Sequence, residues 1–249
     1  MALCCTVMTT EPVAGTPPTE AQATNSATES AFRQLVGFAA YVRLRLFVEV
    51  AQHVWGTHDL NDAERLLRRT MHIGEQQLAF VNLGQRRFGL SPAQLMGPFD
   101  GVFDSFLLRT QPKNWYEGLL RPIVTQGVAR DLIKLMARGL PASEAKLFQS
   151  ILADNDPDDL IGPQLIRKAV LADPVLGAKL SLWGRRVVGE AFGIGTELLR
   201  KFPALGDLLI KATDDAGPGK LSLKSAQAAA FAELSAAHQE RMESMGLTA

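Results

Sequence analysis

The chain has 249 residues, of which 47% are hydrophobic and 21% are charged. Its 26 Lys and Arg residues balance its 26 Asp and Glu residues, so the formal net charge is zero. This composition is typical of a globular protein with a substantial core. The balanced charge excludes a whole-chain attraction to nucleic acid or to an anionic membrane. Nucleic acid is therefore an unexpected partner, although a local basic face stays open.

The two cysteines, Cys4 and Cys5, are adjacent and lie near the N-terminus. Adjacent cysteines rarely bridge each other and the chain has no third one, so a disulfide framework is excluded. The three residues before them are too few for the apolar core of an export signal. No apolar run approaches the ~20 residues that a membrane span needs. We therefore expect a cytoplasmic protein with no membrane span.

Residues 1–28 are rich in Thr, Ala, Pro, Ser and Glu and bury too little apolar surface to order themselves, which predicts a disordered tail. Residues 29–249 then form the folded domain. Capping hydroxyls between Ser26 and Ser30 predict the start of a long amphipathic helix that ends near Trp55 and Gly56. Its apolar residues recur at a spacing of three to four: Phe32, Leu35, Val36, Ala39, Ala40, Leu44, Phe47, Val48, Ala51 and Val54.

A second helix is expected after Asp59 or Asn61, and Gly89 closes it. The short link makes the first two helices an antiparallel pair. Residues 90–112 contain three prolines and predict a long crossover with one or two short helices.

A third helix is expected over residues 114–138. The fourth begins near Pro141 and is interrupted at Pro157 and again at Gly162 and Pro163, because proline removes an amide donor and clashes with the preceding turn. Asp173 opens a fifth helix that runs to about Phe202. Residues 211–220 predict a loop, and a last helix runs from about Ser222 to Met245. The fold class is therefore all-α, with four long helices and additions.

The layout resembles a ferritin-like four-helix bundle with a long crossover and additional C-terminal helices. More narrowly, residues 31–247 resemble ferritin-like proteins of actinobacteria that are related to tRNA-modifying di-iron hydroxylases. The likeness rests on Phe38–Tyr41, Asn114–Leu119, Ile151–Asp154, Asp173–Pro174, Leu182–Ala191, Ala237–His238, Arg241–Met242 and Gly246–Leu247.

Active members of such a family carry one acid on the first and third helices and acid-x-x-His on the second and fourth. Carried over by motif, the resemblance implies that the six ligand positions of this chain are Arg43, Glu75, Leu78, Gln126, Asp154 and Pro157. Two acids remain and both histidines are lost, whereas iron needs several anionic oxygens and usually imidazole. The resemblance therefore implies a vestigial metal site and no cofactor.

The positions of the histidines also predict that a standard di-iron site is absent, and this argument does not depend on the six positions carried over by motif. Two side chains at i and i+3 share a helix face and can share a metal. The residues three before His53, His58, His72 and His238 are Val50, Trp55, Arg69 and Ser235. No acid-x-x-His motif therefore exists anywhere in the chain.

Arg43 is the most unusual of the six positions. A guanidinium inside a bundle needs carboxylate partners, so one hypothesis is that Arg43 replaces the metal charge beside Glu75 and Asp154. The alternative is that Arg43 extends to solvent along its alkyl stem. Two same-face pairs could also build a different metal site across the first two helices, Glu49 with His53 and His72 with Glu75, although such pairs are more often solvated.

These observations predict a ferritin-like bundle that has lost its di-iron site and acts as a non-catalytic binding or interaction module. A homodimer, or a pairing with a related ferritin-like protein, is the expected assembly. One alternative is a di-iron oxygenase resembling the tRNA hydroxylases, with an unconventional ligand set. Another is a carrier of a lipid or small molecule, which would need an apolar cavity between the helices.

Overall fold

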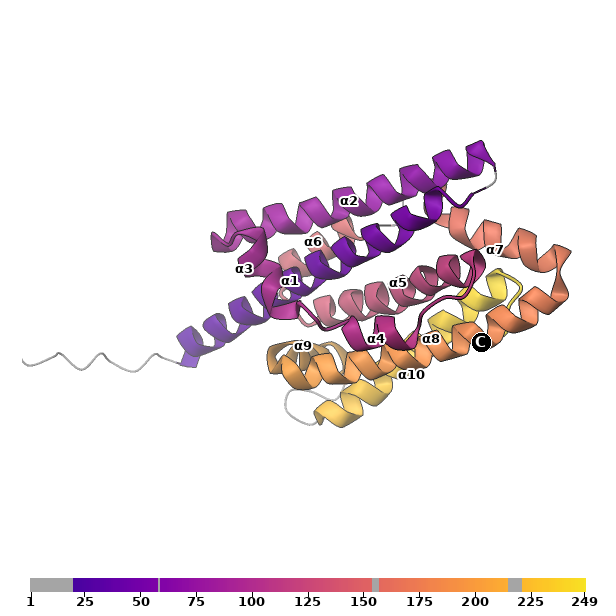
Figure 1. Ribbon diagram of the computed structural model, residues 1–249. Helices are drawn as coiled ribbons and strands as arrows, with labels where there is room; N and C mark the ends of the chain where they lie inside the picture. The colour runs from indigo at the N-terminus through magenta and orange to yellow at the C-terminus, as the bar shows by residue number, and fades with distance from the viewer. Residues whose placement is uncertain (1–19, 58, 154–156, 215–220) are drawn as a thin grey trace, which may run out of the picture.

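The computed structural model describes residues 20–57, 59–153, 157–214 and 221–249, and no strand occurs among them. The helices follow one another with short connections (Figure 1). Their bounds are α1 Glu20–Val54, α2 Leu60–Phe88, α3 Pro92–Met96, η1 Gly97–Phe99, α4 Asp104–Arg109, α5 Trp115–Arg138, α6 Ala142–Ile151, η2 Pro157–Leu160, α7 Ile161–Ala172, α8 Pro174–Lys201, α9 Pro203–Thr213 and α10 Leu223–Ser244. The prediction of an all-α fold is confirmed.

Local capping explains where several of the long helices begin. The Asp59 carboxylate accepts hydrogen bonds from the amides of Asn61 and Asp62, so α2 begins where the sequence predicts. It ends at Gly89, whose φ of 67° lies in the left-handed region that glycine adopts readily. Asn114, Asp173 and Ser222 cap α5, α8 and α10 in the same way, and the predicted starts of these helices are confirmed.

Three expectations about the helices are corrected. α1 begins at Glu20, before the predicted start, so residues 20–28 are helical and only residues 1–19 of the predicted tail lie outside the described residues. Gly162 and Pro163 do not interrupt a helix, because they stand in the first turn of α7, where a missing amide donor costs no hydrogen bond. The segment from Pro203 to Thr213 forms α9, which the sequence did not predict. Residues 211–213 of the predicted loop are therefore helical, and residues 215–220 of it lie outside the described residues.

Helix α5 lies at the centre of the molecule (Figure 1). It packs against α1 on one side and α8 on the other, and also contacts α6, α7, α9 and α10. Helices α1 and α2 form the expected antiparallel pair beside it. Among the described residues, one large buried apolar cluster lies around Phe80 and Phe148 and a second around Leu120 and Trp183. A third, small cluster joins α1 to α2 and consists of Leu46, Val50 and Ile73.

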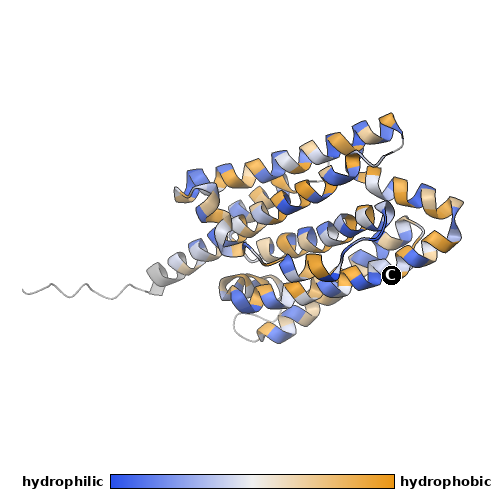
Figure 2. Cartoon of the chain, viewed as in Figure 1, coloured by the Kyte–Doolittle hydropathy of each residue, from blue (hydrophilic) through white to orange (hydrophobic). Residues whose placement is uncertain are grey.

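Among the long helices, α2 and α8 are clearly amphipathic. Figure 2 shows hydrophobic and hydrophilic residues interspersed on the long helices. In α2 and α8 they divide into one side for the core and one for water. Within the described ranges, no helix is both long and apolar enough to cross a membrane.

The buried His238 on α10 makes stability depend on pH. Its side chain is buried, and neither ring nitrogen has a hydrogen-bond partner among the described residues. Burial, assisted by the nearby charge of Arg241, lowers the pKa of His238 from 6.5 to about 4. Because the unfolded chain takes up this proton first as the pH falls, the stability is complete above about pH 6.5 and declines toward pH 4.

When the pH falls from 7 to 5, the unfolding free energy of His238→Leu should decrease by about 1–2 kcal/mol less than that of the wild type. Urea denaturation at the two pH values measures this loss. His72→Gln is the control, because His72 is partly exposed. An unchanged pH dependence in His238→Leu would mean that the ring is already protonated in the folded protein.

Candidate functional site

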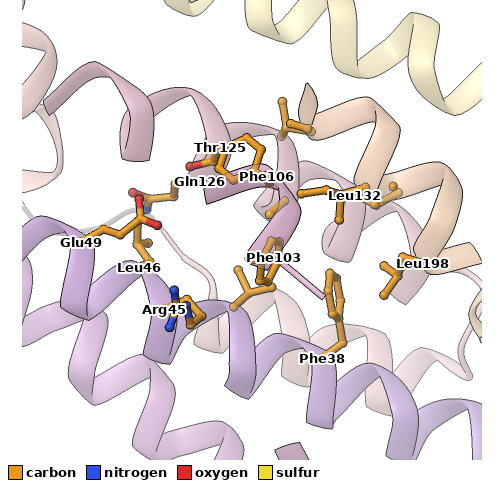
Figure 3. Close-up of a pocket in the computed structure, with 16 residues that line it drawn as sticks. Phe38, Arg45, Leu46, Glu49, Phe103, Phe106, Thr125, Gln126, Leu132 and Leu198 are labelled. Atoms are coloured by element: carbon orange, nitrogen blue, oxygen red, sulfur yellow. The ribbon is translucent and has the colours of Figure 1, made fainter. Parts of the chain in front are cut away.

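A cavity lies inside the bundle between α1, α4, α5 and α8 (Figure 3). Phe38, Leu132 and Leu198 surround one end of it, whereas Arg45, Glu49 and Gln126 stand at the other. About 70 Å³ of this space is open to the centres of water-sized molecules. One water needs about 10–15 Å³ on this measure, so the space is several times larger than a site for a single water.

The cavity is long as well as narrow. Phe38 and Glu49 both line it and are eleven residues apart on α1, which corresponds to about 16 Å along a helix. Small residues on the facing helices, Ala129 on α5 and Ala191 and Gly195 on α8, leave this space open. Its shape therefore suits a slender apolar group better than a broad ring system.

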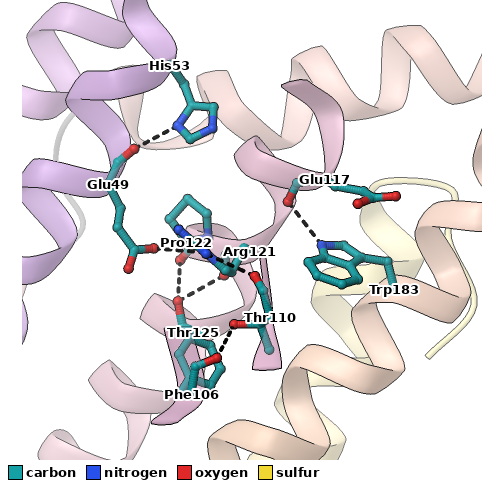
Figure 4. A network of polar contacts seen from close by, with 9 residues as sticks. All are labelled: Glu49, His53, Phe106, Thr110, Glu117, Arg121, Pro122, Thr125 and Trp183. Carbon is teal, nitrogen blue, oxygen red and sulfur yellow. Dashed lines mark hydrogen bonds and ion pairs between the residues drawn. The ribbon is translucent and has the colours of Figure 1, made fainter. Parts of the chain in front are cut away.

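Glu49 lines the charged end of the cavity and pairs with Arg121 beside it (Figure 4). Arg121 Nε lies 3.3 Å from Glu49 Oε2, and both side chains are nearly buried. Arg121 also donates a hydrogen bond to the carbonyl of Thr110 at 2.9 Å. Burial raises the pKa of the Glu49 carboxyl, and the charges of Arg121 and Arg45 partly offset this. The pair thus fastens α1 to α5 beside the cavity.

His53 lies one helical turn after Glu49 on α1 and continues the polar contacts next to the cavity. Its Nδ1 lies 2.7 Å from the carbonyl of Glu49, and Trp115 Nε1 donates to the carbonyl of His53 at 3.1 Å. Burial lowers the pKa of His53. Trp183 makes a similar link from α8, donating to the carbonyl of Glu117 at 3.0 Å (Figure 4). These contacts fix the side chains around the cavity's charged end.

A second polar network crosses the interior from α1 to η2. With its amide oxygen turned toward the two guanidiniums, Gln126 accepts hydrogen bonds from Arg43 Nη1 at 3.2 Å and from Arg69. Arg69 also donates to the Asp159 carboxylate, and both of these side chains are nearly buried. Next to them, Arg65 Nε donates to Asp158 at 2.8 Å. These bonds tie α1, α2, α5 and η2 together.

Comparison with known protein families shows where this architecture belongs. The model of the family described as ferritin-like domain, actinomycetes, matches residues 28–212, well over half of the chain. The chain belongs to this ferritin-like family. The prediction of a ferritin-like all-α fold is confirmed. Among curated proteins, none matches the sequence.

Two of the six ligand positions inferred for this ferritin-like domain lie in the interior. Arg43 is only 1% exposed, so the alternative that it extends to solvent is wrong. Gln126 contacts Arg43 directly. Pro157 opens the short helix η2, and Asp154 lies outside the described residues.

The expected inward orientation of Glu75 and Leu78 is wrong. The Glu75 side chain is 73% exposed and pairs with His72 across 3.7 Å on the surface of α2, and Leu78 is 57% exposed. The buried face of α2 instead carries Leu66, Arg69, Thr70, Ile73, Gln76 and Phe80. Glu75 is therefore no partner of Arg43, and this half of the Arg43 hypothesis is corrected.

The alternative metal site across the first two helices is also not assembled. Glu49 turns its carboxylate to Arg121, whereas Glu75 faces solvent. His53 lies next to Trp115, and His72 contacts Gln76 on its own helix. In the part of the chain that the structure describes, no group of three or more His, Cys, Asp or Glu is placed to hold a metal ion.

The interior groups do not fit the di-iron pair that a ferritin-like fold implies. Two irons need several carboxylates and imidazoles. Among the described residues, the network of Arg43, Arg69, Gln126 and Asp159 offers two guanidiniums, an amide and one carboxylate. Guanidinium has no acceptor atom and its fixed charge repels a cation. These four side chains are therefore suited to one another and not to a pair of iron ions.

Sequence reasoning missed most of the residues around the cavity. Arg121 offered the clearest signal, since it stands in the apolar run Leu119–Pro122, where a charge is expected to be buried and paired. Arg69 and Asp159 gave no comparable signal. Their pairing joins residues ninety positions apart, which spacing along the chain does not reveal.

Proposed function

We propose that this protein is a non-catalytic binding module, a ferritin-like bundle that has lost its di-iron site and binds a slender apolar small molecule in its interior. The observation that carries the proposal is the cavity between α1, α4, α5 and α8. Ligand pockets in helical bundles are concave and mostly apolar, with a few polar groups at defined places. This cavity has that character, with its polar groups at one end.

The loss of the metal site is supported by the composition of the interior network. Arg43 and Gln126 occupy positions where the family resemblance implies acids, and the chain contains no acid-x-x-His motif. The buried guanidiniums of Arg43 and Arg69 supply positive charge in the region where a metal would. We therefore interpret Arg43, Gln126, Asp154 and Pro157 as vestigial positions and expect no metal cofactor.

The alternative is a di-iron oxygenase related to the tRNA-modifying hydroxylases, with ligands that include Asp154. Metal analysis of the purified protein separates the two proposals. We expect well under one iron or manganese per chain, whereas stoichiometric metal with an oxo-bridge absorption band would support the oxygenase.

The expected assembly is a homodimer or a pairing with a related ferritin-like protein in the cytoplasm. Exposed apolar residues support a protein partner. Leu67, Met71 and Leu78 lie at helical spacing on the solvent side of α2, where an apolar stripe suits a neighbouring helix.

The binding proposal is tested by isothermal titration calorimetry with decanol and decanoic acid. Each buried CH₂ group contributes about 0.8 kcal/mol. In a series of shorter alcohols and acids that ends with these two compounds, the affinity should therefore rise about fourfold for each carbon added. Ala129→Leu should lower the affinity at least tenfold, because leucine fills the space and retains a high helix propensity.

A control separates filling of the cavity from damage to the fold. Ala129→Leu should leave the thermal unfolding midpoint equal to or above that of the wild type, since filling a cavity stabilises a core. Ala229→Leu on the exposed side of α10 should change neither property. Absence of binding by either probe, or unchanged binding in Ala129→Leu, would overturn the proposal.

A further inference from the structure

The polar groups of the cavity are confined to one end. Arg45, Glu49 and Gln126 stand there, whereas aromatic and aliphatic side chains surround the rest of the space (Figure 3). A ligand that fills such a space is oriented by it, because its apolar part is stable only among apolar residues and its polar part only at the charged end.

Arg45 lines the cavity and differs from the nearby Arg43 and Arg121. Arg121 contacts Glu49 and the carbonyl of Thr110, and Arg43 contacts Gln126. Arg45 has no ion pair within 4.0 Å among the described residues, and its Nε atom is buried without a hydrogen-bond partner. A buried donor without an acceptor is unfavourable, so an acceptor supplied by a ligand would stabilise this side chain.

The neighbouring Glu49 does not take this role. It lies one turn after Arg45 on α1, and its carboxylate lies against Arg121. The charge of Arg45 reaches Glu49 and counteracts the effect of burial on its pKa, but the two side chains form no hydrogen bond in the described structure. The buried Nε of Arg45 is therefore available to donate a hydrogen bond to another group.

We propose that the cavity selects a single-chain amphiphile with an anionic head group, and that Arg45 binds that head group. The inference rests on the proposed binding function and names the class of ligand. Guanidinium is donor-only, and its planar fork matches the paired oxygens of a carboxylate or a phosphate. The apolar chain would then extend along α1 toward Phe38 and Leu198.

The experiment compares decanoic acid, decyl phosphate and decanol in calorimetric titrations at pH 8. The chains are equal in length, so the ratio of affinities isolates the head group. We expect wild-type protein to bind the better of the two anions about tenfold to hundredfold more tightly than decanol, as a charge-assisted hydrogen bond predicts. The order of the two anions identifies a carboxylate or a phosphate as the head group.

Variants assign the preference to Arg45. In Arg45→Met, which keeps the length of the apolar stem, the ratio of anion to decanol affinity should fall to about one. Arg33→Met, at an exposed position of the same helix, should keep the wild-type ratio. A wild-type ratio near one, or an unchanged ratio in Arg45→Met, overturns the inference while decanol binding leaves the binding function in place. Failure of all three probes to bind contradicts the binding function itself.

Discussion

Asp159→Leu is expected to lower the free energy of unfolding by about 3–5 kcal/mol, because it leaves the buried guanidinium of Arg69 without its carboxylate. The same change removes one ion pair between α2 and η2, while the pair of Arg65 with Asp158 remains. The Arg69 side chain is only 9% exposed, so water cannot replace the lost partner without local rearrangement.

The double variant Arg69→Met with Asp159→Leu should recover most of this loss. A buried ion pair gains little over apolar groups of similar size, since desolvation of both charges offsets their attraction. Urea denaturation of the single and double variants measures the coupling. The coupling should be large and favourable, with the double variant more stable than Asp159→Leu alone.

An exposed pair on the same helix is the matched control. Arg68 and Glu64 lie 2.6 Å apart, and both side chains are more than half exposed. Arg68→Met with Glu64→Gln should change the unfolding free energy by less than about 0.5 kcal/mol. If the interior pair behaved like this surface pair, the network would have no structural role.

Gly139→Ala is expected to destabilise the fold by about 3 kcal/mol, since it forces two backbones apart. A Cβ atom at Gly139 would lie 2.2 Å from the carbonyl oxygen of Leu208. The main chain at the end of α5 therefore contacts the main chain of α9. In the alanine variant, no side-chain rotation could relieve the overlap between the added Cβ and this carbonyl.

Gly189→Ala tests the same chemical change where there is room. A Cβ atom at Gly189, inside α8, meets nothing within 4 Å. Alanine is favoured over glycine in a helix interior by about 0.5–1 kcal/mol, so this variant should be more stable than the wild type. Relative to the wild type, the thermal unfolding midpoint should fall in Gly139→Ala and rise in Gly189→Ala. Shifts in the same direction would contradict the close approach of α5 and α9.

Helix boundaries could be predicted from the sequence because they depend on local chemistry. Asp59, Asn114 and Asp173 begin helices through side-chain bonds to nearby amides, and Gly89 ends one through its own backbone conformation. These signals lie within a few residues of the boundary they determine. Helix α9 was missed because it begins at Pro203, directly after the end of α8, with no intervening loop.

The inward face of α2 could not be predicted in this way. Leu67, Met71 and Leu78 are exposed although they are apolar, while Arg69 and Gln76 are buried although they are polar. Hydrophobic spacing therefore gave no unique inward face, and the ligand pattern of the resembling family placed Glu75 inside. Burial of Arg69 depends on Gln126 and Asp159, which lie on other elements.

The cavity is likewise a property of the packing and not of any one helix. Small residues at 129, 191 and 195 lie on two helices, α5 and α8, and the space beside them is bounded by Phe38 and Leu46 of α1. The family resemblance placed Arg43 at an inward position, with an extension to solvent as the alternative, and its burial decides between the two. Its contact with Gln126, and the place of Arg45 in the lining of the cavity, required the three-dimensional arrangement.

The claim that the bundle interior binds a slender ligand is tested most directly by a crystal structure of the protein with decanoic acid. The predicted result is one extended chain between α1, α4, α5 and α8, with its carboxylate at Arg45 and its methyl end near Leu132 and Leu198. A structure in which side chains close this space, or in which the acid binds only at the surface, would contradict the claim.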